Sequence, residues 1–186
     1  GFPEFDKKLK DLKISIRPLG KNGYFSKKIQ VFNNSVGYAS KEQGGNLIVR
    51  EQWLENPSWQ IIILEDDSSE FIKLKEYLLN KKSAFIPYLG KNDHFANINK
   101  VCEIGLNNEC SSTNLISSLF CENEFKVSSS PKRGELSFLF KEISPYSLQK
   151  DYHFYEYKSL VFTNNLVQNI NNKSIYSYND LNYYFM

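Results

Sequence analysis

The feature that most constrains the fold is the run Trp59-Gln60-Ile61-Ile62-Ile63-Leu64. It is apolar and rich in β-branched residues, with Pro57 before it and Asp66-Asp67 after it. Such a run, bounded by residues that end regular structure, is typical of a strand. It therefore predicts a strand over residues 59–64, around which the neighbouring segments can be placed.

A helix is predicted directly after this strand. Phe71, Leu74 and Leu78 recur at helical spacing, as in a helix that packs one apolar face against a core. Asp67 is expected to cap this helix, with Glu70 at the position of a capping-box partner.

Further extended runs lie on both sides of this pair. Residues 12–17, 29–32 and 47–49 precede it, and residues 101–106 follow it. Strand, strand, helix, strand is the last part of a ferredoxin-like or RNA-recognition-motif unit. The chain opens instead on Gly1 and on residues 2–9, which are typical of a helix end or a linker. We therefore expect an N-terminally incomplete domain, either a fragment or a trimmed chain.

Residues 33–46 are polar and contain Gly37, Gly44 and Gly45 between two extended runs. This pattern predicts a protruding hairpin or flexible finger. An ordinary surface hairpin without a function is the other interpretation.

The composition changes after about residue 107. A serine-rich connector is expected over residues 111–118, and a turn over residues 128–134. Strands are expected at residues 124–127, 135–143, 152–162 and 175–178, before the terminal run 182–186, with Asn-rich loops at 164–165 and 169–172. We predict an α+β protein: a ferredoxin-like or RRM-type domain over residues 1–107, then a small antiparallel β-rich domain over residues 108–186.

Charge and cysteine content limit the kinds of site that the chain can carry. The net charge is only +2, so any nucleic-acid surface has to be a local patch. Cys102, Cys110 and Cys121 lack metal-like spacing, and the chain has two histidines, so we expect no metal, no other cofactor and no disulfide framework. A cytoplasmic location follows from this cysteine usage. No apolar run reaches membrane-spanning length, so no membrane partner is expected.

Residues 86–98 combine a rigid Pro87, a permissive Gly90, a cation, a histidine and amides in one predicted loop. Loops on a scaffold are where binding residues concentrate. Lys91, Asn92 and His94 offer donors that suit phosphates and base edges. With the basic and glycine-rich segments upstream, this loop predicts an RNA-binding face. Its candidate residues are Lys21, Lys27, Lys28, Tyr38, Lys41, Arg50, Gln52, Gly90, Lys91, Asn92 and His94. For any single lysine, a solvated surface is the alternative interpretation.

Two segments resemble a known family. Pro87-Tyr88-Leu89-Gly90-Lys91-Asn92-Asp93-His94-Phe95-Ala96-Asn97 resembles the proline–leucine–glycine–basic loop of the CRISPR-associated Cas-five family, in particular its type I-B branch. Val49-Arg50-Glu51-Gln52-Trp53-Leu54-Glu55-Asn56-Pro57-Ser58-Trp59 resembles the basic–glutamate–x–leucine–x–asparagine–proline–aromatic segment of that branch. The resemblance extends from about Leu12 to Leu106.

The resemblance implies a non-catalytic, crRNA-binding subunit of a type I CRISPR surveillance complex (Cascade), a ribonucleoprotein for antiviral defence. Such a subunit caps the complex and binds the 5′ repeat-derived handle of the crRNA. The backbone filament subunit and the large subunit would be its protein partners. Residues 33–46 would be a finger between handle nucleotides, and residues 87–96 would lie near the handle or the large subunit. The chain departs from the family in having few basic residues in this finger and no opening strand.

Two other functions stay open. The first is a metal-independent endoribonuclease that processes CRISPR repeat RNA. Such an enzyme needs a general base, a general acid and a cation, and His94, Lys91 and Tyr38 are residue types that can supply them. The second is a protein-only scaffold whose finger contacts a neighbouring subunit and never RNA. Phosphate contacts would distinguish RNA binding from the scaffold, because they make affinity fall steeply with salt.

Overall fold

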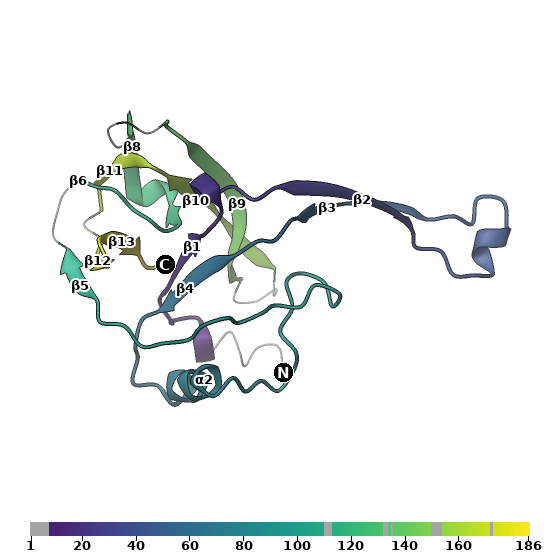
Figure 1. Cartoon of the computed structure of the whole chain (residues 1–186), viewed down its shortest axis with the longest axis horizontal. Helices are drawn as coiled ribbons and strands as arrows, with labels where there is room; N and C mark the ends of the chain where they lie inside the picture. Colours follow the sequence, from purple (N-terminus) through teal and green to yellow (C-terminus); the bar gives the residue numbers. More distant parts are fainter. Residues whose placement is uncertain (1–7, 110–112, 132–133, 135, 150–153, 172) are drawn as a thin grey trace. The chain divides into compact units, whose positions relative to one another are not determined.

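The computed structural model describes residues 8–109, 113–131, 134, 136–149, 154–171 and 173–186 (Figure 1). The chain divides into two compact units, residues 17–60 and the remainder, 1–16 with 61–186. This division differs from the boundary expected near residue 107. The helix end or linker expected over residues 2–9 falls outside the described residues, apart from Lys8 and Leu9.

The smaller unit, residues 17–60, is built on an antiparallel hairpin. Strand β2 (Lys27–Asn33) pairs with β3 (Ile48–Leu54), from Lys27 opposite Leu54 to Asn33 opposite Ile48. Figure 1 shows the two strands side by side along their length, with the short helix η2 (Ala39–Lys41) in the connection between them. Another short helix, η1 (Lys21–Gly23), precedes β2. The finger expected at residues 33–46 thus corresponds to the tip of this hairpin.

This hairpin unit has no core of its own, since none of residues 17–60 is buried. Its base is fixed by local contacts, such as the edge-to-face pair of Phe25 and Trp59, whose ring centroids lie 5.3 Å apart. A two-stranded hairpin with no buried face is marginally stable in water.

The predicted strand is β4 (Trp59–Ile63), whose residues from Ile61 onward belong to the larger unit, and the predicted helix is α2 (Ser69–Leu79) of that unit. β4 pairs with β1 (Ile14–Pro18) in a two-stranded sheet. The prediction for the cap of α2 is wrong: Ser68, not Asp67, is the N-cap, and its hydroxyl accepts the N–H of Phe71 at 3.2 Å. Glu70 is not the capping-box partner either, because its carboxylate accepts the hydroxyl of Ser69 instead.

The prediction of a strand at residues 101–106 is wrong. These residues form no ladder, and the next strand, β5 (Asn107–Glu109), pairs with β12 (Ile175–Tyr178), which also pairs with β13 (Leu181–Tyr184). The physical reason is that an alternating pattern only indicates which side chains face a core. It does not show that another strand lies alongside to form hydrogen bonds with the backbone. What holds is the coarser prediction of an α+β, strand-rich protein with several small antiparallel sheets.

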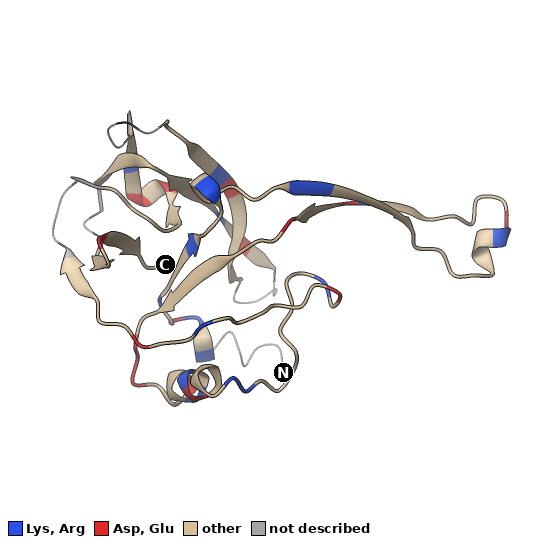
Figure 2. Cartoon of the chain, viewed as in Figure 1, with Lys and Arg blue, Asp and Glu red and all other residues tan. Residues whose placement is uncertain are grey.

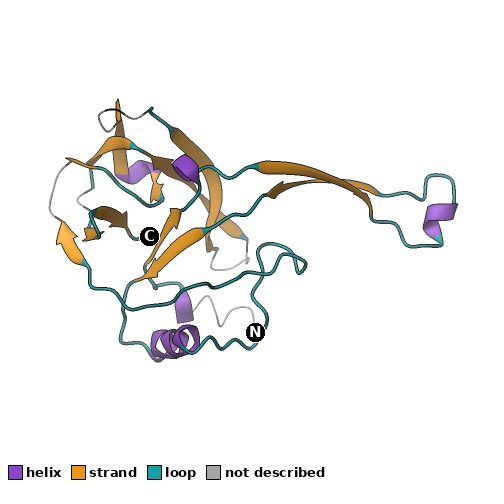
Figure 3. Ribbon diagram, in the orientation of Figure 1, coloured by secondary structure: helices purple, strands orange, loops and turns teal. Residues whose placement is uncertain are grey.

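Two more sheets make up the β-rich part (Figure 3). The first has the order β7 (Phe120–Cys121), β10 (Tyr155–Thr163) and β9 (Leu139–Leu148). The second has the order β6 (Thr113–Asn114), β11 (Asn165–Asn169) and β8 (Phe125–Pro131), with η3 (Glu122–Glu124) just before β8.

Two loop predictions are corrected by these strands. β8 continues to Pro131 through the segment expected to turn at residues 128–134, and β11 includes Asn165 and Asn169, where loops were expected. The buried amide side chain of Asn165 is hydrogen-bonded, accepting from the Ser137 hydroxyl at 2.9 Å, which removes the usual penalty for burying it.

The core of the larger unit consists of two clusters. One contains Ile116, Phe120, Phe125, Val161, Val167, Ile175 and Tyr184. The other contains Ile62, Tyr183 and Phe185, with the half-buried Leu64, Ile104 and Leu106 packed against it. In the first cluster the Phe125 ring packs edge-on against Phe120 and Tyr184, at centroid distances of 5.1 and 5.2 Å. These clusters, rather than one large sheet, hold the larger unit together.

Candidate nucleic-acid interface

The predicted RNA-binding residues fall into two groups. Those of the first group belong to the hairpin unit: Lys21, Lys27, Lys28, Tyr38, Lys41, Arg50 and Gln52. Those of the second group lie in one turn of the larger unit: Gly90, Lys91, Asn92 and His94. The two groups are therefore separate candidate surfaces.

Strand alternation sorts the hairpin into two faces. We call one the open face, because every residue on it is exposed: Lys27, Ile29, Val31 and Asn33 on β2, opposite Leu54, Gln52, Arg50 and Ile48 on β3. On the other face, Gln30, Phe32, Val49, Glu51 and Trp53 are half-buried and only Lys28 is exposed. Lys27 and Lys28 therefore point to opposite faces, and the predicted cations do not share one surface.

The open face mixes cations with large apolar side chains. Ile29 is 70% exposed and lies opposite Gln52, and Val31 lies opposite Arg50. Cations suit phosphates, while apolar side chains can pack against unstacked bases. The apolar members of the open face, such as Ile29 and Val31, were not among the RNA-binding residues predicted from the sequence. A signal for this face was available in the alternation of residues 48–54. It places a cation and an amide on the same face as two apolar residues.

The hairpin unit carries an excess of positive charge. Figure 2 marks basic residues at the start of β2 and again at the tip. Residues 17–60 contain six cations (Arg17, Lys21, Lys27, Lys28, Lys41 and Arg50) and three glutamates (Glu42, Glu51 and Glu55). Their formal net charge is thus +3 in a chain whose total is +2. This is the local basic patch that an RNA surface on a nearly neutral chain requires.

The tip of the hairpin presents an aromatic ring on ordered backbone. Tyr38 is 77% exposed and is the N-cap residue of η2. Where the strands end, Asn33 donates its side-chain amide to the Asn46 side chain at 3.0 Å. The Asn34 N–H donates to the Leu47 carbonyl at 2.8 Å, which closes the strand ends. An exposed ring at this position can stack on a base.

The turn of the larger unit is a small hairpin of its own. Tyr88 and Phe95 form an isolated bridge, and the N–H of Leu89 donates to the His94 carbonyl at 2.8 Å. Gly90 has φ +79°, a left-handed conformation that a side chain would strain. The N–H of His94 donates to the carbonyl of Lys91 at 3.0 Å, so these two residues are held in one turn.

The surface around this turn is more apolar than the sequence analysis predicted. Phe85 is 88% exposed and Phe95 68%, and the other exposed apolar side chains are Ile86, Tyr88, Leu89 and Ile98. Exposed apolar groups clustered in this way mark interaction surfaces. This composition suits a protein contact at least as well as a phosphate.

The three residues considered for a nuclease do not fall in one unit. Lys91 and His94 share the turn, whereas Tyr38 belongs to the hairpin unit. Of the three groups considered for a nuclease, the turn by itself therefore contains two, the imidazole of His94 and the ammonium of Lys91.

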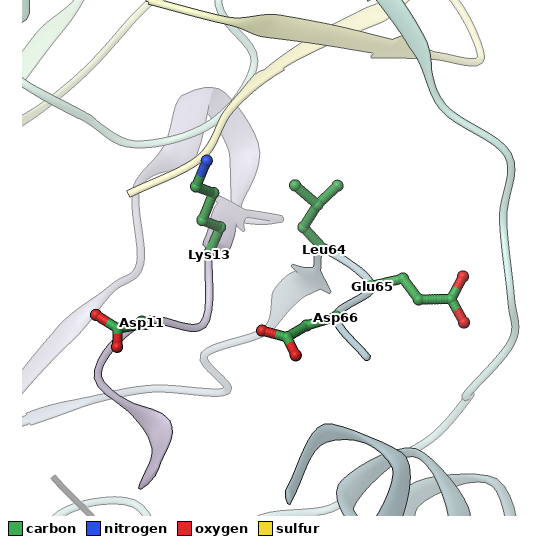
Figure 4. Close-up of a pocket in the computed structure, with 5 residues that line it drawn as sticks. All are labelled: Asp11, Lys13, Leu64, Glu65 and Asp66. Carbon is green, nitrogen blue, oxygen red and sulfur yellow. The ribbon is translucent and has the colours of Figure 1, made fainter. Parts of the chain in front are cut away.

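A pocket of about 200 Å³ is lined by Asp11, Lys13, Leu64, Glu65 and Asp66 (Figure 4). Hydrogen bonds from Ser68 lower the pKa of Asp66, so this carboxylate is occupied in structuring the turn before α2. Figure 4 shows Lys13, Asp11 and Glu65 pointing in different directions rather than toward one point. Among the residues with described positions, no three His, Cys, Asp or Glu side chains are grouped so that they could hold a metal ion.

Comparison of the chain with protein-family models, curated proteins and solved structures finds no match. In the part of the chain that the structure describes, no helix is both long and apolar enough to cross a membrane.

Proposed function

We propose that this protein is a non-catalytic crRNA-binding subunit of a type I CRISPR surveillance complex, which binds the 5′ repeat-derived handle and caps the complex in antiviral defence. The observation that carries the proposal is the open face of the β2–β3 hairpin, where Lys27, Arg50 and Gln52 alternate with exposed Ile29 and Val31. The resemblance of residues 49–59 and 87–97 to the Cas-five family selects crRNA among possible RNAs.

The chemistry of the hairpin supports binding of single-stranded RNA rather than of a duplex. Single-stranded RNA exposes bases that can pack on apolar and aromatic side chains while cations hold the phosphates. The open face supplies both kinds of group, and Tyr38 adds a ring at the tip.

The turn at residues 86–98 supports a role in assembly. Its exposed Ile86 and Phe95, together with Phe85 directly before the turn, suit a protein neighbour, such as the large subunit or the backbone filament subunit of the complex. We also propose that β1, β4 and α2 belong to a ferredoxin-like unit, since two strands followed by a helix are part of that motif.

The test is a gel shift with labelled CRISPR repeat RNA over a range of salt concentrations. The test variant is Lys27→Gln/Arg50→Gln, which removes both cations of the open face. The matched control is Lys100→Gln/Lys126→Gln, which removes the same charge from exposed positions of the larger unit. We expect the open-face variant alone to bind more weakly, with the slope of log K against log salt reduced by about two.

A single variant, Lys28→Gln, sharpens the test, because Lys28 neighbours Lys27 but points to the other face. We expect it to bind like the control. An equal loss of RNA affinity in all variants would mean that the protein attracts RNA non-specifically through its overall charge. If the protein with its partners present did not bind repeat RNA at all, the proposal would be contradicted.

The same samples on a denaturing gel separate binding from cleavage. We expect intact RNA with both the unmodified protein and His94→Ala. Specific cleavage that is lost in His94→Ala would instead identify the ribonuclease.

A further inference from the structure

A groove of about 170 Å³ lies between the end of α2 and residues 83–98 in the larger unit. We call it the α2 groove. Its lining combines two cations with apolar and aromatic residues, chiefly Lys81, Lys82, Tyr77, Leu78, Pro87 and Ile98. Pockets for small molecules have roughly 300–1,000 Å³, so the α2 groove is small for a metabolite and suits a single side chain of a larger partner.

Both walls of the α2 groove are held by backbone hydrogen bonds. The N–H of Lys82 donates to the carbonyl of Tyr77 at 2.8 Å, which closes the last turn of α2. On the other wall, the N–H of Ala96 donates to the carbonyl of Pro87 at 2.8 Å. The groove is thus formed in the free chain, and binding does not require these segments to become ordered.

The chain that connects the two walls exposes large apolar side chains. Phe85 is 88% exposed and Ile86 67%, and both lie between Ser83 and Pro87, which line the groove. Exposed apolar groups beside a groove are typical of protein interaction sites, where a buried side chain anchors the partner. A phosphate backbone would gain little from these side chains, so the surface favours a protein over a nucleic acid.

The two lysines define the charge that such a partner has to carry. Among the described residues that line the groove, none is acidic. Lys82 pairs with Glu76 at 3.8 Å, with the two side chains 62% and 59% exposed, and an exposed pair of this length contributes little. The ammonium groups can therefore pair with carboxylates of a partner.

The backbone of Lys81 is in a conformation that normally favours glycine. Its φ is +52°, at the position just after the helix where a left-handed residue closes the final turn. Glycine is the usual residue there, because a side chain strains this conformation. The chain has a lysine in spite of this strain, and strained residues concentrate at binding sites.

We propose that the α2 groove binds a partner protein through one apolar side chain, which enters the groove, and through neighbouring carboxylates, which pair with Lys81 and Lys82. The volume of the groove sets the first requirement and its two lysines set the second. The proposal rests on the assembly role proposed above for residues 86–98, to which it adds the chemistry of the neighbour, but it does not rest on RNA binding.

The test is binding of a synthetic peptide to the full chain, followed by the NMR chemical shifts of the amides of Lys82, Ala96 and Ile98. The probe, the Glu/Leu peptide, has a central leucine with two glutamates on each side and capped ends. One matched peptide has glycine in place of the leucine, and another has lysines in place of the glutamates. We expect saturable shifts with the Glu/Leu peptide alone, because only this peptide has both an apolar anchor and negative charge.

Variants of the two lysines test their part in binding. Lys81→Gln/Lys82→Gln should bind the Glu/Leu peptide about fivefold more weakly, as expected for the loss of two exposed ion pairs. The matched control, Lys10→Gln/Lys126→Gln, removes the same charge from exposed positions that do not line the groove and should bind like the unmodified protein.

Lys81→Gly separates binding from a structural role. It should weaken peptide binding and yet raise the temperature of unfolding, because glycine relieves the strain at this position. A lysine that only stabilised the end of α2 would give a lower temperature of unfolding and unchanged peptide binding.

The proposal would be overturned if no peptide shifted these amides, or if the peptide with glycine bound as well as the Glu/Leu peptide. Shifts caused by oligouridylate instead of the peptide would make the groove a nucleic-acid contact. Shifts that depend on protein concentration without any probe would identify a second copy as the occupant, and either result would contradict the proposal. Lys27→Gln/Arg50→Gln should bind the peptide normally, so a failure of RNA binding is distinguishable from a failure here.

Discussion

Ser118 is a polar residue with no exposed surface, in a segment that the sequence predicted to be a polar connector. Its hydroxyl donates to the carbonyl of Tyr184 at 3.3 Å and accepts the N–H of Tyr184 at 3.0 Å. We predict that Ser118→Ala lowers the free energy of unfolding by about 1–3 kcal/mol, because it leaves both backbone groups unsatisfied in the core. Urea unfolding measures this change.

Ser117→Ala is the matched control for this prediction, since Ser117 is half-buried and its backbone N–H, not its side chain, donates to Asn182. An equal loss in both variants would show that the hydroxyl of Ser118 is not what stabilises Tyr184.

Cys121 and Tyr184 make stability depend on pH in the alkaline range. Burial raises the pKa of the Cys121 thiol above its ordinary 9.0, and burial together with Cys121 raises the pKa of the Tyr184 phenol. The folded state therefore retains protons that the unfolded state loses, so stability is complete below about pH 9 and falls as the pH rises above it. We predict this fall in urea unfolding between pH 8 and 10.5.

Tyr184→Phe should flatten that alkaline decline, because one of the two titrating groups is removed. Tyr88→Phe, which changes a 54% exposed tyrosine, should leave the decline unaltered. Identical pH profiles for Tyr184→Phe and the unmodified protein would contradict the prediction.

At the scale of elements, the start of α2 depends on a single hydroxyl. Ser68→Ala removes the N-cap acceptor of the Phe71 N–H and should cost about 1 kcal/mol. Asp67→Ala, at the residue that the sequence predicted to be the cap, should cost much less, because no cap bond involves Asp67. Thermal unfolding of the two variants compares them, and a larger effect of Asp67→Ala would disprove the assignment.

Elements with a local signature could be predicted from the sequence, while those that depend on distant partners could not. β4 and α2 are defined by patterns within a few residues, and both lie where the sequence predicted a strand followed by a helix. β11 was missed because Asn164 and Asn165 are typical of loops. The structure buries both, and the side chain of Asn164 bonds the backbone of Leu136 and Phe138, which lie 26–28 residues away.

The candidate site was predictable in the same limited way. Residue types identified Lys27, Arg50 and Tyr38, but the register of β2 against β3 could not be predicted from them. Register decides that Lys27 shares a face with Arg50 and that Lys28 does not. The exposure of Ile29 was equally hidden, since an apolar residue in an alternating strand normally faces a core.

At the scale of the whole molecule, burial and charge are divided between the two units. The hairpin unit has no buried residue and a formal charge of +3, whereas every buried residue in the described part of the chain lies in the other unit. A binding element without a core can adjust to a ligand at little cost to the fold, because its opening leaves the clusters around Phe125 and Tyr183 unaffected.

This division predicts two levels of stability within one chain. Amides of Ile29–Phe32 in the hairpin should exchange with deuterium at least about 100-fold faster than those of Val161 and Val167, because the hairpin can open while the core stays folded. Native-state hydrogen exchange measures both sets in one sample. Repeat RNA should slow the hairpin amides and leave Val161 unchanged, because a ligand of the open face stabilises only the closed hairpin. If the hairpin and Val161 instead exchanged with the same free energy, the two units would unfold as one.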